Sequence, residues 1–355
     1  MKSDLRIGIA GGGLLGRLCA WRLSLQGHHI SLFEASSLER PAGACWTAAG
    51  MISPLSEVVA TEREVYDMGL QSLAIWPRWI AELEASQGRN MHYRQAGSVV
   101  VAHPLDEAEL RQFHQDLRSK LGDSSDVELL DASGIQRLEP DLADHFQQGL
   151  YLKSEADINN RRLLGALLDE LRKNGANLHE NCKVQSCEPF RICHAQGTDE
   201  FDLVIDTRGL GAKDVFPGLR GVRGEVLIVA TDEIKLNRPV RMMHPRYKLY
   251  AVPKPNGQIV IGATEIESED MSPISLQSSM ELSSALYALN PAFAEARIVE
   301  TSVNCRPALM NNLPYVESQA GLLRANGLHR HGYLLSPVVV SDVLSKINQL
   351  NQNVA

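Results

Sequence analysis

The sequence lacks a long apolar run, a paired cysteine motif and an excess of positive charge. No stretch of about 18 consecutive apolar residues occurs, which excludes a transmembrane helix. Six cysteines are scattered without a CxxC pair, so neither a metal site nor a disulfide framework is indicated. Lys and Arg total 35 against 43 Asp and Glu. This net charge of −8 disfavours nucleic acid or an anionic membrane as the main partner.

The sequence also has no internal repeat, and its N-terminus (MKSDLRIGIAGGG) lacks the layout of a cleavable signal peptide. Hydrophobic residues are 44% and charged residues 22%, as is ordinary for a soluble globular protein. A chain of 355 residues exceeds what one compact core usually holds, so we expect two domains or one bilobed unit. We expect a reduced, cytoplasmic protein.

The chain opens with the pattern of a β-α-β unit. Residues 5–10 form a short apolar strand, residues 14–26 read as a helix, and residues 29–34 read as a second strand. Gly27 is placed to end the helix in a left-handed turn. Such a unit predicts a parallel sheet at the start of the chain.

The turn between the first strand and the helix, Gly11-Gly12-Gly13-Leu14-Leu15-Gly16, satisfies GxGxxG. Gly11 permits a tight turn, Gly13 lets the backbone approach a pyrophosphate, and Gly16 allows close packing of the helix on the strand. Glu34 ends the second strand about 20 residues on, where a carboxylate binds ribose hydroxyls. The pattern predicts a dinucleotide, and the acid favours FAD or NAD over NADP.

Two kinds of segment alternate along the rest of the chain. Helices are predicted over 62–84 and 161–173, an apolar strand and Gly-rich turn over 202–211, and a strand, turn and helix over 321–348. Segments such as GSVVVA, GEVLIVA, KLYAVP and GQIVIGAT look like antiparallel strands. We therefore predict an α/β plus α+β protein, with a parallel-sheet domain interrupted twice by an antiparallel-sheet domain. The predicted domains are 1–85, 146–220 and 305–355, and 86–145 with 221–304.

A run of small residues, GACWTAAGMISP at 43–54, favours a flavin, because small side chains let a backbone lie against the flavin ring. With the opening fingerprint, this run resembles the D-amino-acid oxidase superfamily of FAD amine oxidases. The resemblance is closest to glycine oxidase of the thiamine-biosynthesis type. Four further segments match it in the family's order and cover nearly the whole chain: GVRGE (221–225), LYAVPKPNGQIVIGAT (249–264), CRPALMNNLPYV (305–316) and NGLHRHGYLLSP (326–337).

The resemblance implies a Rossmann-like FAD domain, an antiparallel-sheet substrate domain and non-covalent FAD, because neither Cys45 nor Cys305 matches a flavin-attachment position. The positions that the resemblance assigns to the cofactor begin with the fingerprint residues Gly11, Gly13, Leu14, Leu15 and Gly16, followed by Glu34, Ala35, Ala44, Cys45, Ala49, Gly50, Met51, Val184, Leu328, His329, Arg330, His331, Gly332, Tyr333 and Leu334.

The resemblance also implies three catalytic-site residues. Arg306 of the RP motif binds the substrate carboxylate, since its planar fork donates two parallel hydrogen bonds; the alternative is an ordinary buried ion pair with a protein carboxylate. Tyr250 of the Y-x-V-P strand lies beside the carboxylate, with cross-strand packing as the alternative. Arg330 contacts the substrate and the flavin edge, with a surface arginine as the alternative.

Other residues near these motifs have simpler interpretations. His329 and His331 read as a polar rim rather than metal ligands, and Trp76 and Trp79 read as core. Glu265 stands where some glycine oxidases carry an apolar residue, so it either binds an amino group or faces solvent. Lys248 occupies a position that varies within the family. Both residues bear on the substrate and not on the type of reaction.

The reaction that the resemblance implies is oxidation of glycine or another small amino acid. Hydride passes from Cα to flavin N5, giving an imine and reduced FAD, and O2 reoxidises the flavin to yield H2O2. The imine hydrolyses to a 2-oxo acid or serves thiamine thiazole synthesis. The open alternatives are an oxidase of N-substituted glycines, including modified tRNA bases, a D-amino-acid dehydrogenase with a non-oxygen acceptor, and a non-catalytic dinucleotide sensor. Family members are often oligomers, so a homo-oligomer is possible.

Overall fold

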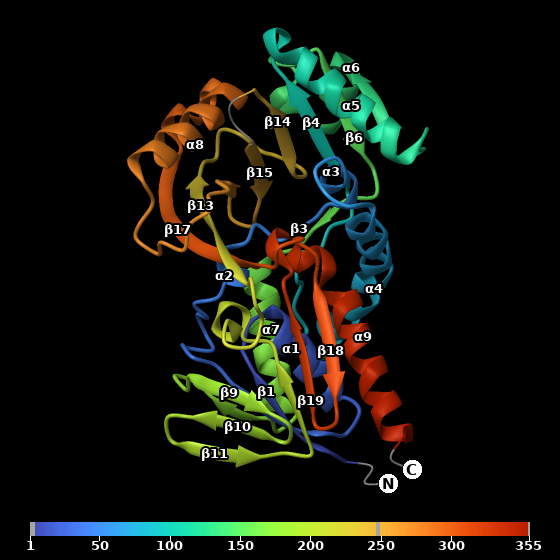
Figure 1. The fold of residues 1–355 in the computed structure, drawn as a ribbon. Helices are drawn as coiled ribbons and strands as arrows, with labels where there is room; N and C mark the ends of the chain where they lie inside the picture. Colours follow the sequence, from blue (N-terminus) through green and yellow to red (C-terminus); the bar gives the residue numbers. More distant parts are fainter. Residues whose placement is uncertain (1–3, 246–248, 354–355) are drawn as a thin grey trace.

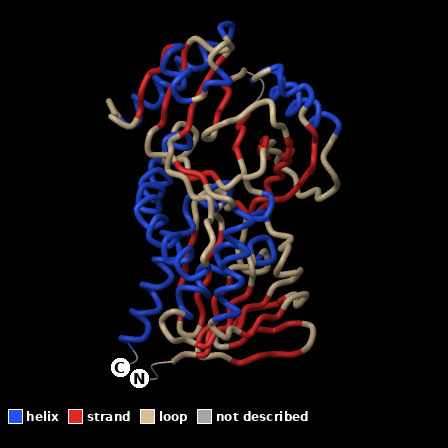
Figure 2. The backbone as a smooth tube through the Cα atoms, turned by 180° about the vertical axis from the view of Figure 1, so that it is seen from behind, coloured by secondary structure: helices blue, strands red, loops and turns tan. Residues whose placement is uncertain are grey.

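The computed structural model describes residues 4–245 and 249–353, so Lys248 lies outside the described residues. Two units, each built on its own sheet, are stacked one above the other (Figure 1). The view from behind shows several strands and loops running between them (Figure 2). In the described ranges, no helix is both long and apolar enough to span a bilayer. This mixed architecture confirms the predicted fold class.

The first unit is a six-stranded sheet in the order β18-β19-β12-β1-β2-β8. Its strands pair in parallel except for the antiparallel edge strand β18. Both faces of the sheet are covered, which explains why its central strands are almost wholly apolar. The strands are β1 (Arg6–Ala10), β2 (His29–Phe33), β8 (Asn177–His179), β12 (Leu203–Asp206), β18 (Tyr315–Gln319) and β19 (Leu322–Asn326).

One face of this sheet packs on helices and the other on a small antiparallel sheet. The helices on the sheet are α1 (Leu14–Ser24) and α9 (Gly332–Asn353), while α7 (Asn160–Lys173) packs chiefly on α1 and α4 (Arg63–Gln87) chiefly on α9. The small sheet is β9 (Val184–Glu188), β10 (Arg191–His194) and β11 (Gly197–Glu200). The side chain of Asn159 accepts a hydrogen bond from the Arg162 backbone N–H at 3.0 Å, which fixes the start of α7. Trp76 and Trp79 of α4 are buried among these helices, as predicted.

The second unit is an eight-stranded sheet in the order β17-β13-β16-β15-β14-β4-β6-β5. Its strands are β4 (Ser98–Ala102), β5 (Val127–Asp131), β6 (Gln148–Leu152), β13 (Arg220–Ala230), β14 (Val240–Met243), β15 (Leu249–Pro253), β16 (Gln258–Gly262) and β17 (Arg297–Ala308). Helices α5 (Glu107–Leu121), α6 (Ala132–Leu138) and α8 (Leu276–Leu289) pack on this sheet. β6 lies in this sheet although it follows the predicted boundary at residue 145. The division into domains stays a prediction.

The sequence predicts that residues 97–102 form a strand with antiparallel neighbours. This prediction is wrong for one of the two strands that flank it. β4 pairs antiparallel with β6 but parallel with β14. The chain between β4 and β14 passes through the first unit, and a long connection of this kind allows parallel pairing.

Short elements fill the space between the two sheets. They are α2 (Ala44–Thr47), the two-stranded pair β3 (Met51–Ile52) and β7 (Ala156–Asp157), α3 (Pro54–Val58), and the 3-10 turn η5 (His329–His331). The remaining 3-10 turns are η1 (Pro104–Asp106), η2 (Pro140–Leu142), η3 (Gly209–Ala212) and η4 (Pro291–Glu295). Of the positions that the sequence singles out, Ala44 and Cys45 lie on α2, Met51 on β3, and His329, Arg330 and His331 on η5.

The turn from β1 into α1 depends on close backbone packing at Gly16. A Cβ atom at Gly16 would lie 1.9 Å from the carbonyl oxygen of Gly11, well inside contact distance. This contact is with a backbone atom, so no side-chain rotation can relieve it. The first turn of α1 therefore lies against the glycine turn before it.

We predict that Gly16→Ala lowers the free energy of unfolding by about 1–3 kcal/mol or more, since the added methyl group overpacks a backbone contact. Urea unfolding followed by circular dichroism measures the change. Gly165→Ala is the matched control, because a Cβ at this position in α7 meets nothing within 4 Å and alanine favours a helix. Equal stability of both variants would show that the turn tolerates a side chain at position 16.

Candidate active site

The β1–α1 turn and Glu34 form one connected structure. The backbone N–H of Gly12 donates to Glu34 Oε2 at 2.8 Å, and the Ser36 N–H and hydroxyl donate to Glu34 Oε1 at 3.0 and 2.7 Å. Arg17 is buried beneath the turn, where its guanidinium donates to three backbone carbonyls, including that of Gly12. These contacts hold Glu34 next to the glycine turn.

The N-terminus of α1 fits a phosphate group. No side chain caps α1 at Gly13, and a Cβ at Gly13 would approach only the sulfur of Cys45, at 3.7 Å. Glycine at this position therefore borders space that protein atoms do not fill. Free N–H groups and the positive end of the helix dipole favour an anion there. These features suit a dinucleotide pyrophosphate.

Segments distant in sequence converge on this turn. The Tyr333 hydroxyl donates to the carbonyl of Cys45 at 2.9 Å, and Asn160 Nδ2 donates to the same carbonyl at 3.2 Å. Trp76 Nε1 in turn donates to the carbonyl of Tyr333 at 2.9 Å. The start of α9, α2 and α7 are thereby fixed against one another beside α1.

The two histidines of η5 are buried, so their interpretation as a polar rim is wrong. The whole-residue exposure of His329 is 7% and that of His331 is 2%. The sequence motif gives no sign of this burial, which arises where η5 lies between the two sheets. Neither ring nitrogen of His329 has a hydrogen-bond partner within the described residues, and burial lowers its pKa to about 3. Buried polar atoms without a protein partner fit a site that receives a polar group.

The structure brings most of the predicted cofactor positions into this region. Leu14, Leu15, Cys45, Leu328, Tyr333 and Leu334 share one hydrophobic cluster. Ala49 and Met51 pack with Tyr250 in a second cluster, and Val184 lies with Phe33 in a third. Tyr333 is buried, with its hydroxyl hydrogen-bonded to the carbonyl of Cys45. The assignment of individual residues to FAD stays a prediction.

Arg306 lies on β17, and its guanidinium is held by backbone carbonyls. Its Nη1 and Nη2 both donate to the carbonyl of Thr264 at 3.1 Å, and Nη1 also donates to the carbonyl of Arg223 at 3.3 Å. A Cβ at Gly224 would lie 2.4 Å from Arg306 Nη2, so glycine is needed beneath the guanidinium. Within the described ranges, no carboxylate lies at ion-pair distance from Arg306. This geometry argues against the alternative of an ordinary buried ion pair.

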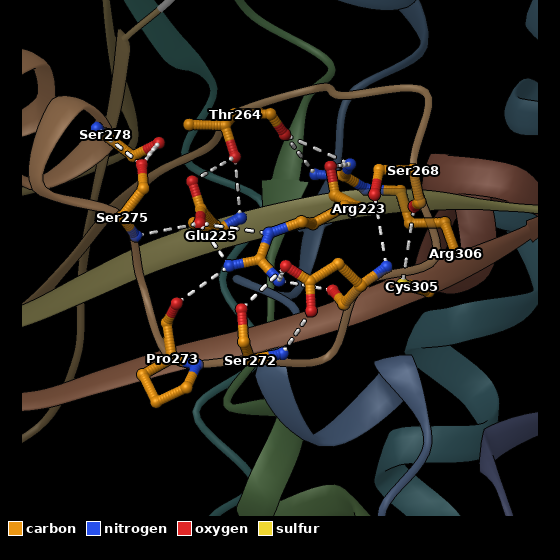
Figure 3. Close-up of polar contacts among 11 residues, drawn as sticks. Arg223, Glu225, Thr264, Ser268, Ser272, Pro273, Ser275, Ser278, Cys305 and Arg306 are labelled. Carbon is orange, nitrogen blue, oxygen red and sulfur yellow. Dashed lines mark hydrogen bonds and ion pairs between the residues drawn. The ribbon is translucent and has the colours of Figure 1, made fainter.

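A buried ion pair holds the loop that carries Thr264 (Figure 3). Arg223 Nη2 lies 2.6 Å from Glu225 Oε1, and both side chains are almost fully buried. The backbone N–H of Glu225 donates to the Thr264 hydroxyl at 2.9 Å, and Arg223 also donates to the carbonyl of Pro273 at 2.9 Å. The Ser275 N–H donates to Glu225 at 3.2 Å. Arg306 is thus oriented by a carbonyl whose own position is fixed.

Tyr250 lies on β15 between Arg241 of β14 and Gly262 of β16, its cross-strand neighbours. Burial raises the pKa of the Tyr250 phenol, and the guanidinium groups of Arg306 and Arg241 act in the opposite direction. The hydroxyl therefore stays protonated at neutral pH and lies in the field of these arginines. Tyr250 and Arg306 come from different strands but face the same region.

Arg330 is not a surface arginine. Its Nε donates to Glu57 Oε2 at 2.8 Å, and its Nη1 donates to Glu265 Oε2 at 2.7 Å. Glu57 of α3 also accepts from Arg241 Nη2 at 2.6 Å, and His331 Nε2 lies 3.1 Å from it. Burial alone would raise the pKa of Glu57, but Arg241, His331 and Arg330 hold it well below its usual value. Two carboxylates thus surround one predicted site arginine.

The sequence motifs indicate Arg306, Tyr250 and Arg330 but not Glu57 or Arg241. Glu57 and Arg330 are 273 residues apart, and Glu57 and Arg241 are 184 apart. Glu57 follows the small-residue run without belonging to a recognisable motif. A charged residue inside the short apolar segment PLSEVV is the one local signal that could have drawn attention to it.

Comparisons with known proteins agree with this geometry. The profile of the DAO family, described as "FAD dependent oxidoreductase", matches residues 6–342. The chain is 37% identical over 343 residues to "Putative thiamine biosynthesis oxidoreductase ThiO" of Rhizobium etli, covering 97% of this chain and 96% of that protein. It is 24% identical to the "Glycine oxidase" of Bacillus licheniformis, covering 93% and 89%. The crystal structure of glycine oxidase from Geobacillus kaustophilus superposes with a TM-score of 0.85 at 25% identity, covering 98% and 95%.

We predict that Glu57→Gln lowers the free energy of unfolding by about 3–5 kcal/mol, because it leaves Arg241 and Arg330 in a buried site with one carboxylate fewer. The effect depends on pH. Glu57 has a depressed pKa when folded, so its contribution is complete above about pH 4.5 and is lost as the pH falls further. Chemical unfolding at pH 7 and at lower pH measures this.

Glu62→Gln is the control, because Glu62 is exposed and makes no side-chain cap to α4. It should leave the stability almost unchanged at both pH values. If Glu57→Gln and Glu62→Gln have equal effects, Glu57 does not hold the two arginines together.

Proposed function

The chain belongs to the DAO family of FAD-dependent oxidoreductases, and from that premise we propose that it oxidises the amine of glycine or another small amino acid. FAD, predicted from the sequence, is the cofactor of this family. Oxidation of glycine is supported by the similarity to the thiamine-biosynthesis oxidoreductase and to the glycine oxidases. We further propose that O2 is the electron acceptor and that the product serves thiamine thiazole synthesis in the cytoplasm.

One observation carries this proposal: Arg306 has its guanidinium oriented by two carbonyls and is not neutralised by a described carboxylate. A cation in a partly buried position is costly unless a counter-charge binds it. The planar fork suits an amino-acid carboxylate, which accepts two parallel hydrogen bonds from it. Arg306 therefore serves as the carboxylate-binding residue.

The residues around Arg306 perform the remaining tasks of binding and orientation. Tyr250 keeps its proton and can donate its hydroxyl to the same carboxylate. The glycine turn before α1, Glu34 and the first turn of α9 would hold FAD, which supplies the two-electron oxidation when bound. Thr264 fixes Arg306, so the substrate amine is presented in one orientation. The packing of Ala49 and Met51 against Tyr250 excludes water from one side.

We predict that glycine reduces the enzyme-bound flavin. Anaerobic addition of glycine to the purified holoenzyme should bleach the visible flavin absorption, and air should restore it with formation of H2O2. If glycine does not reduce the flavin, glycine is not the substrate, and sarcosine, D-amino acids and N-substituted glycines are the next amines to add. If glycine bleaches the flavin but air does not restore its absorption, the electron acceptor is not O2.

We predict that Arg306→Ala raises the KM for glycine and leaves FAD bound. Loss of the partner of a charged carboxylate costs about 2–4 kcal/mol, or roughly 30- to 700-fold in kcat/KM. Arg306→Lys keeps the positive charge but lacks the planar fork of the guanidinium. Its kcat/KM should therefore lie between those of the wild type and Arg306→Ala. The control is Arg297→Ala, which removes an exposed arginine from the far end of β17. If Arg306→Ala leaves kcat/KM for glycine unchanged, Arg306 does not bind the substrate carboxylate.

A further inference from the structure

We propose that Glu265 determines substrate specificity: by pairing with Arg330, it restricts the site to amines that carry a single carboxylate. The proposal deepens the proposed function and rests on it, because it takes Arg306 as the group that receives that one carboxylate. Three features of the described residues support this role.

The first feature is the balance of charge around Arg330. Two guanidinium groups, Arg241 and Arg330, face two carboxylates, Glu57 and Glu265. The formal charges of these four groups sum to zero. Among the described residues, a second carboxylate on the substrate would therefore meet no uncompensated cation beside Arg330, and it would be repelled by Glu265.

The second feature is the difference in exposure between the two carboxylates. The side chain of Glu57 is 14% exposed, whereas that of Glu265 is 40% exposed. Glu57 has contacts with β14 and η5 and belongs to the buried frame of the site. Glu265 is the more exposed of the two carboxylates that pair with Arg330, so it is the one that a ligand can displace more easily. The group that a substrate carboxylate would have to replace is thus Glu265.

The third feature is that consecutive residues control both arginines. The carbonyl of Thr264 orients Arg306, and the side chain of the next residue, Glu265, pairs with Arg330. Both guanidinium groups therefore contact the same two-residue segment. His329 lies among the same groups, with its Nε2 3.7 Å from Glu265 Oε1. A substrate held on Arg306 therefore extends toward a position that Glu265 already neutralises.

The test compares two amines that differ by one carboxylate. Iminodiacetate and N-ethylglycine are both secondary amines of similar length, but iminodiacetate ends in a second carboxylate where N-ethylglycine ends in a methyl group. In the Glu265→Gln holoenzyme, kcat/KM for iminodiacetate relative to N-ethylglycine should rise by at least about tenfold over the wild type. Glu265→Asp keeps the charge and should retain the wild-type preference.

Glu267→Gln is the matched control. Glu267 lies two residues further along the same loop, but its side chain is 67% exposed and pairs with Arg220 instead. The substitution makes the same change in charge without freeing Arg330. The ratio should stay within about twofold of the wild-type value.

A binding measurement separates this proposal from the proposed function. Diglycolate and ethoxyacetate are the ether analogues of the two amines and cannot be oxidised as amines. Calorimetric titration of the holoenzyme should show that Glu265→Gln tightens diglycolate binding by at least about tenfold, while Arg306→Ala weakens binding of both ligands.

Three results would contradict the proposal. If ethoxyacetate binding depends on Arg306 but Glu265→Gln does not tighten diglycolate, the specificity role is wrong and the proposed function stands. If Glu265→Gln weakens glycine binding without any gain for diglycolate, Glu265 contacts the amino group instead. If neither ligand depends on Arg306, the proposed function fails, and the specificity role fails with it.

Discussion

The site depends on the buried carboxylate of Glu57, which neutralises two arginines from different parts of the fold. Arg241 comes from the second sheet and Arg330 from the turn that leads into the last helix of the first unit, whereas Glu57 lies on α3 between them. A buried charge of either sign is costly alone, so the three side chains stabilise one another only when both units are in place. Glu155 extends this frame, since it accepts hydrogen bonds from the backbone N–H of Ser56 at 2.6 Å and from its hydroxyl at 3.0 Å.

The arginines of the site divide into two kinds according to what surrounds them. Arg330 and Arg241 are paired with carboxylates and serve the frame, whereas Arg306 is held by carbonyl oxygens that orient it without removing its charge. Carbonyl groups are weak counter-charges, so the guanidinium keeps most of its attraction for an anion. The same residue type therefore fulfils structural and binding roles within one site, and the local partners decide which.

The β-α-β start, the glycine turn and Glu34 were predictable because the chemistry of a dinucleotide site requires these residue types at fixed local spacing. Arg306, Tyr250 and Arg330 were indicated by short motifs, through the family resemblance. Glu57 and Arg241 could not be found in this way, since their pairing joins elements 184 residues apart and no local spacing encodes it. The burial of His329 was missed for a similar reason, because NGLHRHG reads as a polar turn until the two sheets enclose it. The parallel pairing of β4 with β14 likewise arises from the long connection between them.

The alternation of the chain between the two sheets has a consequence for biosynthesis. β1 and β2 are made well before β19, which pairs with β12, and before the η5 turn. Both sheets contain strands that are separated by segments of the other, so neither can be completed from a continuous stretch of nascent chain (Figure 1). A complete site therefore requires η5, which is translated after the strands of both sheets. Until then, the growing polypeptide exposes unpaired strand edges, which favour aggregation and binding by chaperones.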